Sequence, residues 1–151
     1  MRSLARVLVL VALTGCGGQE RATPTVADST TSDLAAAWVR SYYKAIDERR
    51  YQEAYAHWAR GGSASGKTFE EFQRGFERTT GVEAKVGTPG PVEGAAGSRY
   101  VEVPVTITAR DQDGTKKSYG GSYTLRLSVV DGATPEQRTW HIDSAVMRPL
   151  E

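Results

Sequence analysis

The chain has 151 residues, with 19 Lys and Arg against 18 Asp and Glu, and a formal net charge of +1. Removal of Arg2 and Arg6 with a predicted export signal leaves 17 basic and 18 acidic residues. This balance argues against a basic surface that would neutralise nucleic-acid phosphates, so no nucleic-acid partner is predicted. The length leaves room for one folded domain.

The first fifteen residues have the layout of an export signal. Arg2 and Arg6 precede an apolar run over residues 7–13, which is too short to cross a bilayer. The run leads into LTGC, residues 13–16, which resembles the lipobox of bacterial lipoproteins, where the cysteine is lipidated and becomes the first mature residue. We therefore expect residues 1–15 to be a lipoprotein signal peptide and Cys16 to carry the membrane anchor.

The residues after the predicted cleavage site point to a location and a tether. Cys16 is the only cysteine, so an intrachain disulfide is excluded. Gly17 follows it, and the resemblance to lipoproteins of Gram-negative bacteria, in which Asp at this place retains the protein at the inner membrane, implies the outer membrane and a periplasm-facing domain. Residues 16–31 are polar and lack an apolar period, which predicts a flexible tether before a domain spanning residues 32–151.

Three helices are predicted in the first half of the domain. The first begins at a cap, Ser32 or Asp33, and its apolar stripe is formed by Leu34, Trp38, Val39, Tyr42, Ala45 and Ile46. A short second helix carries a stripe of Tyr51, Ala54, Tyr55 and Trp58, and this stripe leaves His57 away from its centre. In the third helix the apolar residues are Phe69, Phe72 and Phe76, and Thr68 with Glu71 forms a capping box.

The second half of the domain shows the period of β-strands. Apolar and polar residues alternate over residues 101–110 and again over residues 119–129, and Asp113-Gly114 between them is a hairpin signal. Pro104 indicates an edge or a bulge. A short strand over residues 82–87, a loop over residues 88–98 and a last strand over residues 138–147 complete the pattern. Three helices followed by about four strands predict an α+β fold, with the helices packed on one face of an antiparallel sheet.

The segment GGSASGKT, Gly61 to Thr68, matches the spacing of a phosphate-binding loop. Such a loop needs a buried strand before it, so that backbone N–H groups surround the phosphates at the start of the following helix. Here a helical stripe precedes Gly61, and Thr68 already has a capping role. We therefore predict a turn between two helices and no nucleotide binding.

The segments VRSYYKAIDERRYQEAYAHW, SGKTFEEFQRGF and GSYTLRLSVV with WHIDSAVMRPL resemble the nuclear-transport-factor-2-like superfamily, which includes ketosteroid isomerases and SnoaL-like cyclases. The resemblance covers residues 33–150. It implies a cone-shaped, cystatin-like arrangement in which a curved sheet wraps around the helices and leaves a pocket, used by relatives for catalysis, for ligand binding or not at all. The residues that would face this pocket are Trp38, Tyr42, Tyr55, Trp58, Tyr119, Tyr123 and Trp140, and packing in the core is the alternative role for each.

The resemblance transfers catalysis only in part. Isomerases of this superfamily have a tyrosine four residues before a leucine of the first helix, and Tyr42 stands four residues before Ile46, which suggests an oxyanion donor. Their general-base aspartate falls where this chain has GGSASG, without a carboxylate. Another candidate acid–base set is a pair of His141 and Asp143 on the last strand. His57 or Asp47, from the helices, would complete this set. A solvent-facing pair is the simpler account of His141 and Asp143.

We interpret the chain as a lipid-anchored binding or docking module for a small ligand or an envelope partner. Neither a metal nor a cofactor is predicted, because two histidines without a suitably spaced carboxylate make a poor metal site. One alternative is an isomerase or hydrolase that uses an acid–base pocket in the cone, and another is a docking unit like the related domains that begin some penicillin-binding proteins. Homodimerisation through a sheet face would use Thr106, Thr108, Ser122, Thr124 and Ser128.

Overall fold

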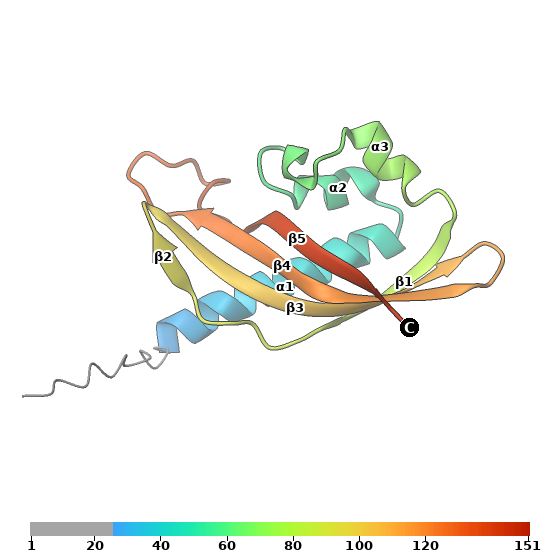
Figure 1. Cartoon of the computed structure of the whole chain (residues 1–151). Helices are drawn as coiled ribbons and strands as arrows, with labels where there is room; N and C mark the ends of the chain where they lie inside the picture. The colour runs from blue at the N-terminus through green and yellow to red at the C-terminus, as the bar shows by residue number, and fades with distance from the viewer. Residues whose placement is uncertain (1–25) are drawn as a thin grey trace, which may run out of the picture.

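The computed structural model describes residues 26–151, so the predicted signal peptide, Cys16 and most of the predicted tether lie outside it. Figure 1 shows long, bent strands accompanied by the helices. The helices of this part are α1 (Val26–Asp47), α2 (Tyr51–Ala56), the 3-10 helix η1 (Ser63–Ser65) and α3 (Phe69–Arg74). The strands are β1 (Thr79–Val86), β2 (Glu93–Ala95), β3 (Ser98–Asp111), β4 (Lys116–Ser128) and β5 (His141–Leu150). None of the helices within residues 26–151 is long and apolar enough to cross a membrane.

The strands form one antiparallel sheet in the order β1-β3-β4-β5, and β2 pairs with the beginning of β3. The described part of the chain therefore has five strands, not about four, because residues 93–95 were expected to belong to a loop. All three residues of β2 are exposed. A strand with no buried face has no hydrophobic alternation, so its sequence carries no signal of pairing.

The predicted alternation is confirmed in β3 and in the second half of β4, whereas residues 118–122 of β4 are all half-buried. Val101, Val103 and Val105 of β3 are buried, while Glu102 and Pro104 between them are exposed. Residues 101–104 lie between the stretches of β3 that pair with β2 and with β1, and there the N–H groups of Gly87 and Gly90 in the connecting loop donate to the carbonyl oxygens of Pro104 and Glu102. Pro104 therefore lies just beyond the last β1–β3 pair, at the end of that ladder, which is a position where a proline is tolerated.

Helix α1 begins at Val26, six residues before the predicted cap at Ser32. Its first turns extend beyond the strands (Figure 1), and the carbonyl oxygen of Thr31 accepts a hydrogen bond of 3.0 Å from Trp140 Nε1. The end of the predicted tether is therefore part of the helix. The predicted apolar stripe is also wrong at Leu34, which is 60% exposed. Ala35 and Ala36 are buried in its place. Because alanine is only weakly hydrophobic, a stripe of large apolar residues does not predict that these two positions are buried.

The glycine-rich segment between α2 and α3 is a turn, as predicted. Gly62 has a φ of 97° and lies against the ring of Tyr55, where a Cβ atom would collide with that ring. The hydroxyl of Tyr55 also donates to the carbonyl oxygen of Lys67 at 2.7 Å. Thr68 and Glu71 form the expected reciprocal capping box at the start of α3. The preceding element is α2, not the strand that a phosphate loop requires.

Candidate functional site

Aromatic rings fill the space between α1, α2 and β4. Tyr42, Trp58 and Tyr123 are all buried, and their ring centroids lie 5.9 to 6.2 Å apart. Trp140 is buried with them, whereas Trp38 and Tyr55 are partly buried against the same core. Six of the seven residues expected to face a pocket therefore belong to or border one packed core. Tyr119 is separate, because it lies near the β3–β4 hairpin opposite Ile107.

Three buried tyrosines form the polar part of this core. The hydroxyl groups of Tyr43 and Tyr123 share a hydrogen bond of 2.5 Å between α1 and β4. Burial raises the pKa of Tyr42, Tyr43 and Tyr123, since a phenolate would be poorly solvated there. All three hydroxyls are therefore neutral near pH 7. Sequence reasoning missed Tyr43, although a rotation of the α1 stripe by one residue would have included it.

His57 is buried in the core, contrary to the prediction that it faces away from the α2 stripe. It is 5% exposed, and its Nδ1 lies 2.8 Å from the carbonyl oxygen of Glu53. Its ring centroid is 4.5 Å from that of Trp38, a contact between α2 and α1 that the pattern of either helix alone does not show. Among the described residues, His57 Nε2 and Trp58 Nε1 have no hydrogen-bond partner.

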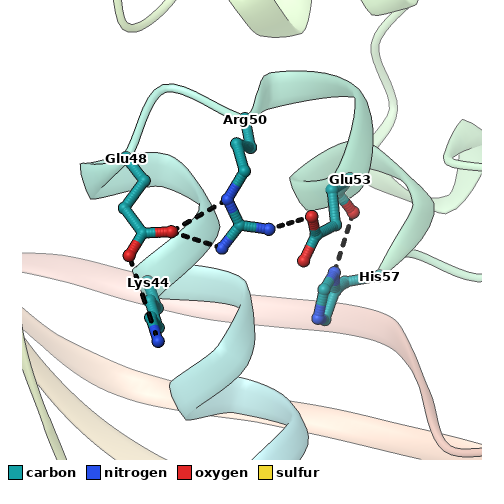
Figure 2. A network of polar contacts seen from close by, with 5 residues as sticks. All are labelled: Lys44, Glu48, Arg50, Glu53 and His57. Carbon is teal, nitrogen blue, oxygen red and sulfur yellow. Dashed lines mark hydrogen bonds and ion pairs between the residues drawn. The ribbon is translucent and has the colours of Figure 1, made fainter.

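The surroundings of His57 hold it in the neutral form. Burial lowers its pKa from 6.5 to about 4, with smaller contributions from the positive charges of His141 and Arg50. Figure 2 shows Arg50 above this histidine, joined to Glu48 and Glu53 by exposed ion pairs. A histidine with so low a pKa is a weak proton acceptor, which argues against His57 as a general base at neutral pH.

The structure separates the remaining acid–base candidates. Asp47 ends α1, where its Oδ1 accepts a hydrogen bond of 2.8 Å from the backbone N–H of Val82 in β1. His141 and Asp143 do not form the suggested pair: Asp143 accepts a hydrogen bond of 3.0 Å from Arg60 Nη1 instead. A β-bulge explains this difference. Leu125 pairs with Ile142 and Thr124 with Ser144, so Asp143 is an extra residue that breaks the alternation.

A pocket of about 560 Å³ lies at one end of the sheet, and we call it the end pocket. It is bounded by residues after α2, by the turn between β2 and β3, by the end of β4, by the following loop and by the first residue of β5. Its polar lining consists of Arg60, Ser98, Arg126, Ser128, Thr134, Glu136, Gln137 and His141. His141 is the only earlier catalytic candidate in that lining, and the predicted aromatic pocket residues are not part of it. The signal that was missed is spread over five separate segments.

The loop of the end pocket has a defined shape. Ser128 N–H donates to the carbonyl oxygen of Gln137 at 2.7 Å, and Val129 N–H donates to that of Gly97 at 2.9 Å. Within the loop, Thr134 and Gln137 exchange two further hydrogen bonds between side chain and backbone. The loop is thus fastened both to itself and to the β2–β3 turn, and this favours a pocket that exists before a ligand arrives.

Two solved structures, both from Novosphingobium aromaticivorans DSM 12444, have a similar overall fold. The first is provisionally named a scytalone dehydratase; it has a TM-score of 0.55 and 13% identity, and the match covers 83% of this chain and 89% of the other. The second is the beta subunit of a provisionally named aromatic-ring-hydroxylating dioxygenase, with a TM-score of 0.52, 10% identity and coverage of 80% and 89%. The chain has a nuclear-transport-factor-2-like α+β fold. No protein-family model and no curated protein sequence matches it.

The nuclear-transport-factor-2-like fold accounts for the position of the aromatic core, which lies where the helices meet the curved sheet. It does not identify a reaction, because one fold carries many functions. Within residues 26–151, no group of three or more His, Cys, Asp or Glu side chains is arranged to hold a metal ion. On the sheet surface proposed for dimerisation, Thr106 is exposed, and the other four residues of that set are partly exposed.

Proposed function

We propose that the protein is a lipid-anchored envelope module that faces the periplasm and binds a small ligand in the end pocket without transforming it. The observation that carries this proposal is the composition of the pocket. Arginines, hydroxyls and an amide line it, together with apolar Leu127 and Val130, which suits recognition of a small molecule. The acid–base candidates Tyr42, His57 and Asp47 are not in its lining.

Native mass spectrometry of the protein, extracted gently from its own envelope, tests the binding function. We expect a small molecule to be retained by the wild-type chain and to be lost from Ala59→Phe, which adds a ring to the pocket wall. Gly94→Ala is the matched control, because a Cβ atom at Gly94 meets open space. An unliganded wild-type chain bound stoichiometrically to a second protein would instead support docking to an envelope partner.

The proposed anchor rests on the sequence around Cys16, which carries a signal-like segment before it and no other cysteine after it. We expect the wild-type protein to incorporate a labelled fatty acid and to fractionate with the outer membrane. Cys16→Ser should abolish both the labelling and the membrane association. Labelling of that variant would contradict the proposed anchor.

Acid–base catalysis is the second candidate function, and His141 is the observation that favours it. His141 lines the end pocket, and its Nδ1 lies 3.1 Å from the carbonyl oxygen of Thr139, a contact that orients the ring. An isomerase or hydrolase would convert the retained molecule during incubation, and His141→Gln would stop that conversion. A ligand recovered unchanged from both proteins would support the binding function.

A further inference from the structure

The end pocket combines positive charge with apolar surface. Arg60 and Arg126 line it together with one acidic residue, Glu136, and Leu127 and Val130 provide apolar contact. From this combination we infer that the pocket recognises a small organic anion, a carboxylate attached to a compact apolar body. The inference rests on the proposed binding function and specifies its ligand.

Arg126 is the central group for this recognition. It lies on β4, and its Nε donates a hydrogen bond of 3.0 Å to Ser98 Oγ on β3. Ser98 is 4% exposed, so a buried hydroxyl fixes one edge of an otherwise exposed guanidinium. Among the described residues, nothing contacts the two terminal nitrogens of Arg126 by a hydrogen bond or an ion pair. A guanidinium held in this way presents paired N–H groups that match both oxygens of a carboxylate.

Arg60 provides a second positive charge, from the segment that follows α2. Its ion pair with Asp143 holds the side chain near β5 and neutralises part of its charge. Its φ of 57° lies in the left-handed region, where glycine would be less strained. Ala96, another residue of the pocket wall, has a φ of 42°. Ala96 and Gly97, whose φ is 79°, form the two-residue turn of the β2–β3 hairpin, and a type I′ turn of this length requires positive φ at both positions.

The apolar part of the lining determines what accompanies the charge. Val130 packs on Gly97, close enough that a Cβ atom at Gly97 would collide with it, and Leu127 at the end of β4 borders the pocket while its side chain is partly buried against the core. A ligand with a carboxylate at Arg126 would place its apolar body against these residues. Inorganic anions would form only the first contact, so a compact organic acid fits the lining better.

Ligand-observed NMR titration of the full-length protein tests this inference with benzoate and its neutral isostere benzamide. We expect benzoate to bind more tightly than benzamide, and Arg126→Gln to weaken benzoate by at least about tenfold, as loss of a charged hydrogen bond implies. Glu136→Gln should strengthen benzoate binding, because it removes the one acidic side chain of the lining. Neither substitution should change benzamide binding.

Arg148→Gln is the matched control. It also removes one arginine, but Arg148 is an exposed residue of β5 that lies outside the pocket lining. This control should leave benzoate binding unchanged. Arg126→Lys keeps a positive charge, so it should bind benzoate more tightly than Arg126→Gln and less tightly than the wild-type chain. Equal binding of both probes would overturn the inference but leave the binding function standing. Failure of both probes to bind the wild-type chain overturns the inference as well. By contrast, if the wild-type chain purified from its envelope extract retained no small molecule, that result would contradict the binding function itself.

Discussion

At the scale of single residues, burial of His57 makes the folded state sensitive to mild acid. Its folded-state pKa is about 4, below the 6.5 of an exposed histidine. The unfolded chain therefore binds more protons between pH 4 and 6.5, and stability rises with pH across that window. We expect the free energy of unfolding to fall by up to about 3 kcal/mol as pH drops from 6.5 to 4.

Urea denaturation at a series of pH values measures this loss. In His57→Gln the part of the pH dependence that comes from His57 should disappear, even though the variant is less stable overall. His141→Gln provides the control: it removes the smaller contribution of the neighbouring histidine and leaves His57 buried, so most of the pH dependence should remain. An unchanged pH profile in His57→Gln would show that another group controls acid sensitivity.

The hydrogen bond between Tyr43 and Tyr123 makes a second prediction at this scale. Tyr123→Phe leaves the Tyr43 hydroxyl buried without its partner, and we expect a loss of about 1 to 3 kcal/mol. Removing both hydroxyls should cost less than the sum of the single changes, because no buried polar group is then left unpaired. A double-mutant cycle based on urea unfolding measures this coupling, and strict additivity would contradict it.

At the scale of elements, the pairing of β4 with β5 depends on a glycine. A Cβ atom at Gly121 would collide with the carbonyl oxygen of Val146, so the backbone of β5 approaches β4 too closely for a side chain. We expect Gly121→Ala to destabilise the fold by about 1 to 3 kcal/mol and to speed amide exchange in β5. Gly94→Ala should have little effect on either measurement. Slow exchange in β5 of Gly121→Ala would mean that the strand shifts without loss of pairing.

At the scale of the whole molecule, Asp47 joins the helical layer to the sheet. Its carboxylate accepts the backbone N–H of Val82, so the end of α1 is tied to β1. We expect Asp47→Ala to lower the free energy of unfolding by about 1 kcal/mol, because the hydrogen bond is exposed and water replaces part of it. Asp47→Asn keeps the accepting oxygen and should retain most of the stability. If both variants instead abolished a catalytic activity with stability unchanged, Asp47 would have a chemical role.

The sequence determined by itself those features that arise within a single element. The alternation of Val101, Val103 and Val105 predicted a strand with one buried face, and the spacing of Thr68 and Glu71 predicted a capping box. Both are confirmed, because a local period or a local hydrogen bond needs no knowledge of distant residues. The class of fold followed from the order of helices and strands, and the two similar structures bear it out.

Tertiary structure decided the features that depend on several elements at once. His57 is buried because Trp38 of α1 packs on it, although its own helix pattern turns it away from the stripe. The bulge at Asp143 and the contact between Arg126 and Ser98 likewise bring together residues from separate segments. The end pocket gathers its lining from five such segments, so it has no sequence period. Side chains that meet only after folding leave no local pattern, and for this reason the candidate site was not visible in the sequence.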